Sequence, residues 1–536
     1  LQFEDVTTDW GLREDSFSHG AIAADLDNDG DLDIVTNNLS KEAFLYENTA
    51  KQRENAINYL KVKLEGPEKN NLGIGSKIEV RTAEKTFHQY YQPVHGFQSA
   101  NATAAYFALG KDSIISEVKV VWPDGKVEKK AEVSANQTLT FKYEEAYNPT
   151  ENIQVAEPPA LMTLQQNILD YQHVENPFID FKFEPLLPHQ YSKQGPALAI
   201  ADVDGNGLED VFIGGAVKQN GQLFLQQKNG KFTSKTLPDE NYEDTGALFF
   251  DADQDGDQDL YVVSGGNEYN PKTAPYQDRL YLNDGQGNFE KAENALPQLY
   301  SSGNAIIALD YDRDGDQDLF VGGIVVPGNY PIPAESALLQ NDEGKFTNVS
   351  QTVFPKFKDM GLVTDALTSD FNQDGLPDLL LAGEYMPLTF LQNEGGKFRD
   401  ITPTTGIGDK KGWWYSLSQG DFDNDGDMDF VAGNLGLNSR LKANEEEPVV
   451  VKASDFNQDG SLDAVLGYHI KDEKGTKMLF PFHSRDMLAD KMRPIRRQFP
   501  TYLSFAQASM DDVISNFNAN NVYSASANFM QSVYVE

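Results

Sequence analysis

A nine-residue pattern rich in aspartate recurs seven times in this chain and constrains its fold more than any other feature. The consensus is D-x-[DN]-x-[DN]-G-x-x-D, and the copies begin at Asp25, Asp202, Asp251, Asp310, Asp370, Asp421 and Asp455. Together these copies hold 30 of the 83 acidic residues, although they occupy a small part of the 536-residue chain. Solvation of a protein surface does not require such clustering, so the pattern predicts carboxylates with a shared chemical role.

The spacing within each copy is typical of a cation-binding loop. Carboxylate or amide oxygens at positions 1, 3 and 5 converge when the backbone curls, and glycine at position 6 permits a sharp turn that a Cβ atom would obstruct. Position 7 offers its backbone carbonyl, and the aspartate at position 9 closes the ring of donors. Hard oxygen donors in this number suit Ca²⁺, which takes about 6 to 8 oxygen ligands. Without a cation, the carboxylates would repel one another strongly.

We therefore expect Ca²⁺ as the cofactor, at up to seven sites. The candidate ligands at positions 1, 3, 5, 7 and 9 are, loop by loop, Asp25, Asp27, Asp29, Asp31 and Asp33; Asp202, Asp204, Asn206, Leu208 and Asp210; Asp251, Asp253, Asp255, Asp257 and Asp259; Asp310, Asp312, Asp314, Asp316 and Asp318; Asp370, Asn372, Asp374, Leu376 and Asp378; Asp421, Asp423, Asp425, Asp427 and Asp429; Asp455, Asn457, Asp459, Ser461 and Asp463. For any single copy an ordinary Asp-Gly turn without metal is the alternative, but seven copies flanked by strand signals favour a shared metal role. Two loops carry Asn372 and Asn457 at position 3, and we expect weaker cation binding there.

The flanking sequence argues against an EF-hand, the obvious alternative for such a loop. An EF-hand needs a bidentate glutamate at position 12 and helices on both sides. Position 12 is instead Thr36, Ile213, Val262, Val321, Leu381, Ala432 and Leu466. The flanks are short and apolar, as in ALFF before Asp251 and LYVVSGG after Asp259. Each loop is therefore predicted to connect two adjacent antiparallel strands.

The spacing between the loops predicts a β-propeller. From the second copy onward the loops are 49, 59, 60, 51 and 34 residues apart. Most loops are followed by a strand, an Asn/Gly turn and a phenylalanine, as in LYLNDGQGNF (280–289) and LLQNDEGKF (338–346). Each repeat thus holds about four short strands, which is typical of one propeller blade.

These residues resemble the FG-GAP or VCBS repeat, which is the blade of integrin α-subunit propellers. The resemblance covers residues 202–536 most clearly, and the segment 412–440 is similar to a bacterial branch of the family. It implies an all-β fold with Ca²⁺ between the first two strands of a blade, on the lower face of the propeller. We expect residues 197–536 to form a propeller of seven blades that is incomplete in this chain, and residues 1–50 to be the last blade of an upstream propeller.

A separate β domain is expected between the first and second loops, at residues 57–143. Alternation in KIEVRT and EVKVVW predicts strands there, and PDG at 123–125 predicts a turn. Asn71, Gly73, Gly75, the step Ala108-Leu109-Gly110 and the turn Trp122-Pro123-Asp124-Gly125 resemble the ASPIC/UnbV domain. Together with the FG-GAP repeats, this domain resembles bacterial relatives of the cartilage acidic protein family. Residues 144–196 are expected to be a linker into the propeller.

Charge and composition exclude several classes of function. Lysine and arginine number 44 against 83 acidic residues, and the formal net charge is −39. Such a chain lacks the basic surface that nucleic-acid binding and electrostatic membrane binding require, so we expect no nucleic-acid partner and no direct membrane insertion. The absence of cysteine excludes disulfides and thiolate metal sites. No apolar run reaches the ~18 to 20 residues that a membrane span needs.

The expected metal sites favour a location outside the cell. At millimolar extracellular Ca²⁺ even sites with a Kd of ~10⁻⁴ to 10⁻³ M fill, whereas cytosolic Ca²⁺ would leave them mostly empty. We therefore predict an extracellular or bacterial cell-surface protein, associated with the outer membrane. Its predicted role is to bind a protein or glycan ligand without enzymatic activity, in adhesion or nutrient capture, with a membrane-protein complex as a further possible partner.

The alternative function is that of a polysaccharide-degrading enzyme, a lyase or hydrolase with its site on the propeller axis. The seven histidines are scattered, and no HExxH, GxSxG or P-loop motif occurs. We therefore assign no catalytic residue. Turnover of a glycan would favour the enzyme, and saturable binding without product would favour the binding protein.

We expect the ligand on the propeller face opposite the Ca²⁺ loops, where the connections are long and aromatic. These connections are residues 265–279, 323–336, 383–390, 412–416 and 483–498. Trp413, Trp414 and Tyr415 suit stacking on sugars or anchoring a protein partner. Arg485 and Arg493, from a basic cluster, suit an acidic ligand. The alternatives are packing of the tryptophans between blades and, for the arginines, a solvated face or internal salt bridges.

Overall fold

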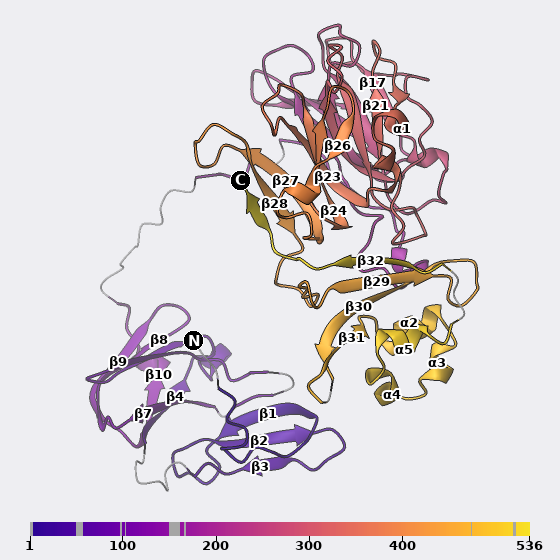
Figure 1. Cartoon of the computed structure of the whole chain (residues 1–536). Coiled ribbons are helices and arrows are strands. Elements are labelled where there is room, and N and C mark those ends of the chain that lie inside the picture. Colours follow the sequence, from indigo (N-terminus) through magenta and orange to yellow (C-terminus); the bar gives the residue numbers. More distant parts are fainter. Residues whose placement is uncertain are drawn as a thin grey trace. The chain divides into compact units, whose positions relative to one another are not determined.

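The computed structural model divides the chain into two compact units, between Thr163 and Leu164. It describes residues 4–49, 57–96, 99–101, 103–149, 161–165, 168–472, 474–517 and 521–536. Parts of the predicted first blade and linker, at residues 1–3, 50, 150–160, 166 and 167, lie outside the described residues. Strands dominate both units, and the α-helices gather mainly in one C-terminal stretch (Figure 1).

The first unit contains a three-stranded antiparallel sheet and a two-sheet β domain. The three-stranded sheet consists of β1 (Ser18–Ala24), β2 (Asp33–Asn38) and β3 (Phe44–Tyr46), and the first Asp-rich loop joins β1 to β2. The β domain has one sheet in the order β10–β4–β7 and one in the order β6–β5–β8–β9. Its elements are β4 (Asn58–Glu65), η2 (Glu68–Asn70), β5 (Lys77–Arg81), β6 (Thr86–Tyr90), β7 (Ala104–Gly110), β8 (Ile114–Val121), β9 (Val127–Ser134), β10 (Gln137–Lys142) and η3 (Tyr143–Glu145).

Alternating apolar residues form the core of this β domain. Leu60 and Val62 of β4 are fully buried, as are Val118 and Val120 of β8. Successive side chains of a strand point to opposite faces, so each pair places both members on the inner face of its sheet. The β domain expected from sequence alternation therefore has a hydrophobic core of its own.

Five consecutive antiparallel sheets, here called blades 1 to 5, make up most of the second unit. Blade 1 consists of β11 (Leu198–Ala201), β12 (Asp210–Ile213), β13 (Gln222–Gln226) and β14 (Phe232–Thr236). Blade 2 consists of β15 (Asp244–Phe250), β16 (Asp259–Ser264), β17 (Arg279–Leu282) and β18 (Glu290–Lys291), with the short helix η5 (Ala274–Tyr276). Blade 3 consists of β19 (Gly303–Leu309), β20 (Asp318–Gly323), β21 (Ala337–Gln340) and β22 (Thr347–Asn348). After α1 (Ser350–Val353) and η6 (Pro355–Asp359), blade 4 is β23 (Leu362–Ser369), β24 (Asp378–Met386), β25 (Thr389–Asn393) and β26 (Phe398–Asp400), followed by η7 (Thr402–Thr404). Blade 5 is β27 (Gly412–Gly420), β28 (Asp429–Asn434) and the last strand, β33 (Val533–Val535). Because β24 also pairs with β27, blades 4 and 5 form one continuous sheet.

The first strands of the five blades lie side by side, in the order β11, β15, β19, β23 and β27. Blades 1 to 4 have four strands each and blade 5 has three, and such an arrangement side by side is typical of propeller blades. Glycines in the first strands permit the close approach of neighbouring blades. A Cβ atom on Gly246 would lie 2.6 Å from the carbonyl oxygen of Asn304, and one on Gly303 would lie 2.6 Å from a methyl group of Val263. Only glycine fits at these two positions without displacement of backbone or core atoms.

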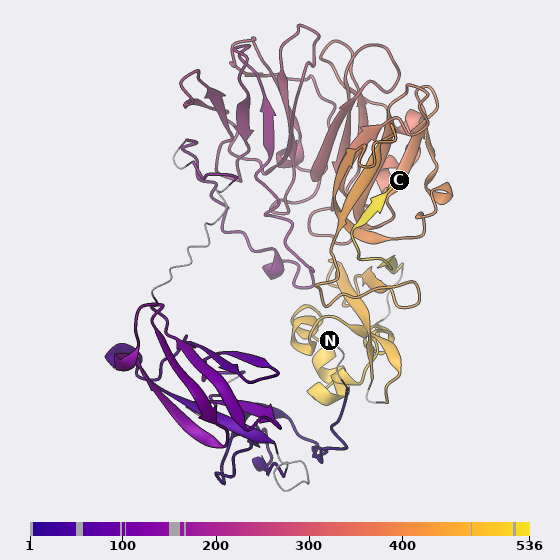
Figure 2. The same ribbon diagram turned by 90° about the vertical axis from the view of Figure 1, so that its left-hand side faces the viewer.

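A sixth sheet packs against the ends of blades 3 to 5 that lie opposite the Asp-rich loops (Figures 1 and 2). It has the order β31–β30–β29–β32. Its strands are β29 (Val449–Ser454), β30 (Asp463–Lys471), β31 (Lys477–Pro481) and β32 (Tyr523–Ala527), and between β31 and β32 lie α2 (Arg485–Lys491), α3 (Ile495–Gln498), α4 (Tyr502–Ala506) and α5 (Met510–Ile514). Val451 and Leu466 of this sheet share a core with Ile324, Tyr385 and Trp413 at the blade ends. This core covers part of the face on which we expected a ligand.

Residues 168–196, which we expected to belong to a linker, pack into the second unit. Asp180, in the short helix η4 (Asp180–Lys182), is fully buried, and so are Tyr191 and Ser192. The Asp180 carboxylate accepts hydrogen bonds from the backbone N–H groups of Tyr191 and Ser192, each at 3.1 Å. It also accepts one from the side chain of Asn267, at the end of blade 2. These contacts hold the segment on the blade ends opposite the Asp-rich loops.

The expected all-β fold with FG-GAP-type blades is confirmed, and the total of seven blades stays a prediction. A helical insertion was not expected at residues 483–498, which we interpreted as a loop connection. Leu488, Met492 and Ile495 are fully buried there at helical spacing and form a core with α5. No helix in the described residues is long and apolar enough to cross a membrane.

A buried histidine links the helical insertion to the segment that precedes blade 1. His483 is 2% exposed, and its Nε2 donates a hydrogen bond to the carbonyl oxygen of Leu186 at 3.0 Å. Its Nδ1 has no partner among the described residues. Burial lowers the pKa of His483 to about 4.

We predict that His483 makes the protein less stable as the pH falls from about 6.5 toward 4. In that window the unfolded chain takes up a proton that the folded state excludes, and the loss in unfolding free energy amounts to about 3 kcal/mol. His483→Gln keeps a donor for Leu186 but does not ionise, so its stability should fall less over the same window. Urea unfolding of both proteins between pH 7 and 4.5 measures the difference, and parallel pH curves would contradict the prediction.

Candidate functional site

Each Asp-rich loop lies where the sequence places it, between the first two strands of a sheet. The loops of blades 1 to 5 follow β11, β15, β19, β23 and β27, the first loop follows β1, and the seventh follows β29. The aspartate at position 9 begins the second strand in every case, and none of the seven is more than 3% exposed. Antiparallel strands alternate in direction, so the long connections after each second strand lie at the opposite end of the blade.

The buried aspartate at position 9 links the loop to the rest of its sheet. In all seven loops its Oδ2 accepts a hydrogen bond from the backbone N–H of position 2, at 2.8 to 3.2 Å. In five loops its Oδ1 accepts a second hydrogen bond from a backbone N–H at the end of the third strand or within two residues after it, at 2.6 to 2.9 Å. The Oδ1 atoms of Asp429 and Asp463 have no hydrogen-bond partner among the described residues, although Lys491 Nζ lies 3.7 Å from Asp463 Oδ1.

An asparagine at the end of the third strand connects successive blades, and the sequence analysis did not assign it this role. The Nδ2 of Asn283 in blade 2 donates to the carbonyl oxygen of Val203 in the loop of blade 1, at 2.8 Å. Asn341 and Asn393 do the same for the loops of blades 2 and 3, at 2.8 and 2.7 Å. The sequence contains a signal for this role, because an asparagine precedes the Gly turn in each of these repeats.

The loop backbone is shaped by its own side chains. Position 5 accepts a hydrogen bond from the N–H of position 7 in all seven loops, at 2.8 to 3.2 Å. The glycine at position 6 has positive φ throughout, as the sequence predicted. Position 4 also adopts a left-handed conformation in every loop, which the sequence analysis missed. Asparagine, glutamine or glycine occupies it six times, and Arg313 occupies it once with φ of 61°.

Several loop carboxylates converge on one point and have oxygens without partners. In each of four loops, three carboxylate oxygens lie within 4.8 Å of one another. The sets are Asp25, Asp27 and Asp29; Asp202, Asp204 and Asp210; Asp251, Asp253 and Asp255; Asp310, Asp312 and Asp318. The Oδ1 atoms of Asp25, Asp251 and Asp310, all at position 1, are buried and have no hydrogen-bond partner among the described residues. Such a set of hard oxygen donors has the chemistry that binds a divalent cation such as Ca²⁺.

Burial and nearby carboxylates raise the pKa of two of the loop aspartates, Asp257 and Asp318. Burial and the neighbouring loop carboxylates raise the pKa of Asp257 to about 6. Burial, opposed by two backbone hydrogen bonds, raises the pKa of Asp318 to about 7. In the loops of blades 1 to 5 no lysine or arginine of the described residues forms an ion pair with a loop carboxylate. A bound cation would supply the missing positive charge.

The first and seventh loops differ, because a lysine side chain reaches each of them. The Nζ atom of Lys61 contacts Asp25 in the first loop. In the seventh loop, the Nζ atom of Lys491 lies 3.6 Å from Asp459 Oδ2 and 3.7 Å from Asp463 Oδ1. An ammonium group therefore offsets part of the negative charge in these two loops. Weaker cation binding was expected at the seventh loop from its asparagine, and Lys491 is a second reason that the sequence alone did not indicate.

The two tryptophans predicted to contact a ligand are buried. Trp413 and Trp414 are 2% and 1% exposed, and Trp414 Nε1 donates to the carbonyl oxygen of Met386 at 3.1 Å. The cause is the pairing of β24 with β27, which encloses both rings between blades and the sixth sheet. The stated alternative, packing between blades, therefore describes their position. Tyr415 is 39% exposed and remains available to a ligand.

The two predicted arginines lie on the helical insertion. Arg485 begins α2, where its Nε donates to the carbonyl oxygen of Phe499 at 2.7 Å and its guanidinium lies 4.9 Å from the ring centroid of Tyr502. These contacts hold α2 against the end of α3 and the start of α4. Arg493 is exposed between α2 and α3. Only Arg493 of this pair presents its guanidinium freely to solvent.

A buried polar group near Trp413 was not indicated by any motif. The carboxylate of Glu384, in β24, is fully buried and accepts a hydrogen bond from the Tyr191 hydroxyl at 3.0 Å. His189 Nε2 lies 2.6 Å from the same carboxylate. The following residue, Tyr385, has a left-handed backbone with φ of 60°, which is rare for a bulky side chain. The sequence separation of these residues hides the cluster, because His189 and Glu384 are 195 positions apart.

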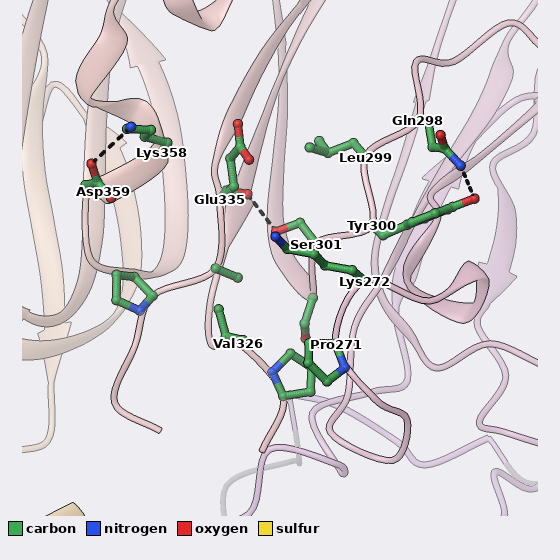
Figure 3. A pocket seen from close by; sticks show the side chains of 14 residues that line it. Pro271, Lys272, Gln298, Leu299, Tyr300, Ser301, Val326, Glu335, Lys358 and Asp359 are labelled. Carbon is green, nitrogen blue, oxygen red and sulfur yellow. Dashed lines mark hydrogen bonds and ion pairs between the residues drawn. The ribbon is translucent and has the colours of Figure 1, made fainter. Parts of the chain in front are cut away.

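A cavity of about 470 Å³ lies among the long connections of blades 2 and 3 (Figure 3). It is lined by Pro271, Lys272, Gln298, Leu299, Tyr300, Ser301, Ser302, Val326, Pro327, Pro333, Ala334, Glu335, Lys358 and Asp359. Two of the connections predicted to bind a ligand, 265–279 and 323–336, supply half of this lining. The volume lies in the range of small-ligand pockets, about 300 to 1,000 Å³.

Comparison with protein-family models identifies both kinds of domain. Residues 66–148 match the ASPIC and UnbV family, and residues 202–262, 263–321 and 370–432 match the FG-GAP-like repeat. The chain therefore contains an ASPIC/UnbV domain and three FG-GAP-like repeats at the matched residues. The resemblance inferred from the Asp-rich loops and from the Trp-Pro-Asp-Gly turn is therefore confirmed.

A curated relative of this chain is distant in sequence. Cartilage acidic protein 1 of Xenopus tropicalis is 24% identical over 288 residues, which are 48% of this chain and 43% of the relative. The match therefore spans less than half the length of that curated relative. Among solved structures, a protein from Lactobacillus plantarum aligns over 76% of this chain and 95% of its own, with 12% identity and a TM-score of 0.28. A TM-score this low does not indicate a shared fold.

We predict that Asp259 is required for stability even without metal, whereas Asp257 is not. Asp259→Ala removes the acceptor for the N–H groups of Ala252 and Asn283 and should lower the unfolding free energy by about 2 to 4 kcal/mol. Asp257→Ala removes one of several repelling carboxylates from the same loop, so stability should stay equal or rise. Denaturant unfolding in metal-free buffer, followed by tryptophan fluorescence, compares the two variants. Equal losses would contradict the separate roles.

Proposed function

We propose that this protein is a calcium-stabilised, non-enzymatic binding protein of the cell surface or extracellular space. In this proposal Ca²⁺ ions bind the Asp-rich loops and hold the blades, and a protein or glycan ligand binds the opposite blade ends. The observation that carries the proposal is the chemical contrast between the two ends of each blade. Converging carboxylates with unpartnered oxygens lie at one end, and long connections around a cavity lie at the other.

The choice of Ca²⁺ follows from the donors. The loops offer carboxylates, side-chain amides and backbone carbonyls, and no imidazole or thiolate belongs to them. Oxygen-only sites with flexible backbone suit Ca²⁺ better than zinc or copper. The loops of blades 2 and 3 are the strongest candidates, since they combine converging carboxylates with unpartnered oxygens. The first and seventh loops contain contacts with Lys61 and Lys491, and the loop of blade 4 carries Asn372.

The proposed location follows from the expected affinity. Loops exposed to solvent on one side resemble extracellular-grade sites, which fill at millimolar Ca²⁺. A chain with net charge −39 would gain most from these ions where calcium is abundant. Association with a bacterial outer membrane through a partner protein belongs to the same proposal.

The proposed ligand site is the cavity between the connections of blades 2 and 3. Tyr300 offers an aromatic ring, while Lys272, Lys358 and Glu335 offer exposed polar groups around it. This mixture suits hydrogen bonding and stacking with a glycan or with a polar protein loop. The lining contains no histidine, cysteine or pair of buried carboxylates that would support catalysis. Tyr415 and Arg493 remain secondary candidates.

We predict different effects of Asp251→Ala in the presence and absence of calcium. With Ca²⁺ about 100-fold above the Kd, loss of one site removes about 2.7 kcal/mol of stabilisation. In chelator, the same change removes a repelling carboxylate together with the acceptor for the exposed N–H of Gly256, so the melting temperature should change little. Calorimetry of wild type and variant in Ca²⁺ and in EGTA measures both effects. Equal losses in the two buffers, or a wild-type melting temperature unaffected by EGTA, would contradict the metal role.

We predict that a glycan or protein ligand binds saturably to the calcium-loaded protein and that Tyr300→Ala weakens it by at least about tenfold. A screen on acidic and neutral glycans and on surface-protein preparations identifies the ligand, and calorimetry measures the affinity. Tyr90→Ala is the control, because Tyr90 is 62% exposed in the first unit and far from this cavity in the sequence. Unchanged binding by Tyr300→Ala would contradict the assigned cavity. Glycan turnover at catalytic rates would contradict the non-enzymatic role.

A further inference from the structure

A second group of potential metal ligands lies away from the Asp-rich loops. His173 and Glu175 belong to the segment before blade 1, and Glu243 directly precedes β15 of blade 2. One potential ligand atom from each of the three side chains lies within 4.8 Å of the other two. Glu243 is at the start of a first strand, so the group lies at the blade ends opposite the loops.

The segment that carries His173 and Glu175 is fixed on both sides by hydrogen bonds. The Tyr171 hydroxyl donates to the carbonyl oxygen of Gly214, and the backbone N–H of Val174 donates to Gln219 Oε1, each at 2.8 Å. Asn176 Nδ2 donates to Glu268 Oε1 at 2.9 Å. These contacts join the segment to blade 1 and to the connection after β16. His173 and Glu175 are therefore held in place by hydrogen bonds of the residues next to them in the segment.

Each of the three side chains in this group has a buried polar atom without a hydrogen-bond partner among the described residues. Glu243 is 1% exposed; its Oε2 accepts a hydrogen bond from the Val217 N–H at 3.2 Å, while its Oε1 has no partner among the described residues. His173 Nε2 lies 2.9 Å from Glu175 Oε1, which leaves His173 Nδ1 and Glu175 Oε2 buried and likewise unpartnered. A buried carboxylate oxygen without a donor is costly, so the arrangement calls for a positively charged partner.

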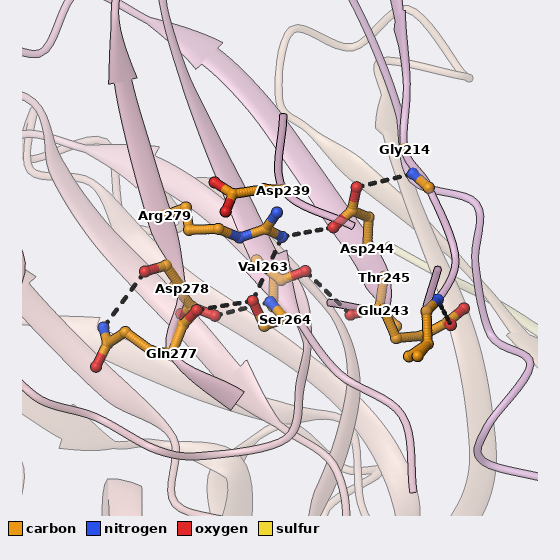
Figure 4. A network of polar contacts seen from close by, with 12 residues as sticks. Gly214, Asp239, Glu243, Asp244, Thr245, Val263, Ser264, Gln277, Asp278 and Arg279 are labelled. Carbon is orange, nitrogen blue, oxygen red and sulfur yellow. Dashed lines mark hydrogen bonds and ion pairs between the residues drawn. The ribbon is translucent and has the colours of Figure 1, made fainter. Parts of the chain in front are cut away.

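The arginine that pairs with the residue after Glu243 is engaged there. Arg279 is buried and directs its guanidinium to Asp244, the residue after Glu243 (Figure 4). Burial, with repulsion from Glu268 and Glu175, raises the pKa of Glu243 to about 9. Glu268 already accepts hydrogen bonds from Asn176 and from the N–H of Asn267. No lysine or arginine of the described residues forms an ion pair with Glu243 or Glu175.

We propose that His173, Glu175 and Glu243 bind a divalent transition-metal ion of the zinc class. Imidazole nitrogen together with carboxylate oxygen is a donor set that suits Zn²⁺, in contrast with the oxygen-only loops. The side chains of His173 and Glu175 are 17% and 26% exposed, so an ion reaches the site from solvent. Three protein donors leave at least one coordination position for water or a ligand group.

This ion would fasten the segment before blade 1 to the first strand of blade 2. Glu243 lies next to the strand, and His173 and Glu175 lie on the segment, so one ion joins chain regions about 70 residues apart. Binding to the folded state alone raises stability by mass action. The site is independent of the Asp-rich loops, because it shares no residue with them.

Isothermal calorimetry with Zn²⁺ on the full chain, in calcium-saturated buffer without chelator, tests the proposal. We expect one zinc ion per chain at this site and a rise in melting temperature with zinc. His173→Ala and Glu243→Gln should each weaken zinc binding by at least about tenfold. His88→Ala is the matched control and should bind as wild type, because His88 is exposed in the first unit. Asp251→Ala should also retain zinc, which separates this site from the loops.

The competing explanation is that Glu243 carries a proton and needs no metal. In that case wild type takes up no zinc beyond the amount bound by His173→Ala, and Glu243→Gln melts at or above the wild-type temperature with and without zinc. Either result overturns the proposal. If the Glu243→Gln variant folds poorly, anomalous diffraction at the zinc edge on wild-type crystals gives a direct readout. A peak between His173, Glu175 and Glu243 supports the site, and the absence of a peak at saturating zinc refutes it. Loss of the zinc site would leave the calcium-dependent stability measured with Asp251→Ala unaffected.

Discussion

The buried aspartate at the end of each loop is the interaction on which the blade array depends. In blade 2, Asp259 accepts one hydrogen bond from its own loop and another from Asn283 after the third strand. The side chain of Asn283 in turn reaches Val203 in the loop of blade 1. The Asp259 carboxylate therefore connects its own loop to the end of the third strand, and Asn283 connects this junction to blade 1. Backbone groups buried at this junction would otherwise lack partners, which is why the loop has a structural role before any cation is considered.

The same loops concentrate negative charge, and the chain deals with it in two ways. In the first and seventh loops an ammonium group of the chain itself, from Lys61 or Lys491, lies against the carboxylates. In the loops of blades 1 to 5 no such side chain forms an ion pair within the described residues, and oxygens of Asp251 and Asp310 stay unpartnered. In the proposed function, a soluble divalent cation would be the remaining source of positive charge. The two groups of loops therefore differ in how much of their negative charge the chain itself offsets.

Local features of the fold could be predicted from the sequence, and features that join distant residues could not. The loops, their position between first and second strands and the glycine at position 6 follow from spacing within nine residues. The burial of Trp413 and Trp414 could not be predicted, because it arises from pairing of β24 with β27 and from cover by the sixth sheet. Residues 168–196 were expected to be a linker for the same reason: their polar and proline-containing sequence has no periodicity, and only contacts such as Asp180 with Asn267 fix their place.

This division between local and long-range order also explains why the two ends of the blades differ. At the loop end, nine consecutive residues determine the geometry, so each copy reproduces the same turn with small changes at position 3 or 4. At the other end, the connections vary in length, and the sixth sheet, the helical insertion and residues 168–196 all pack there. Chemistry that is not repeated, such as the pairing of His189 with Glu384 or the group around Glu243, therefore accumulates at that end. The residues that differ from blade to blade lie at the blade ends opposite the Asp-rich loops. These residues, and not the repeated loops, are therefore the candidates for a specific function of this chain.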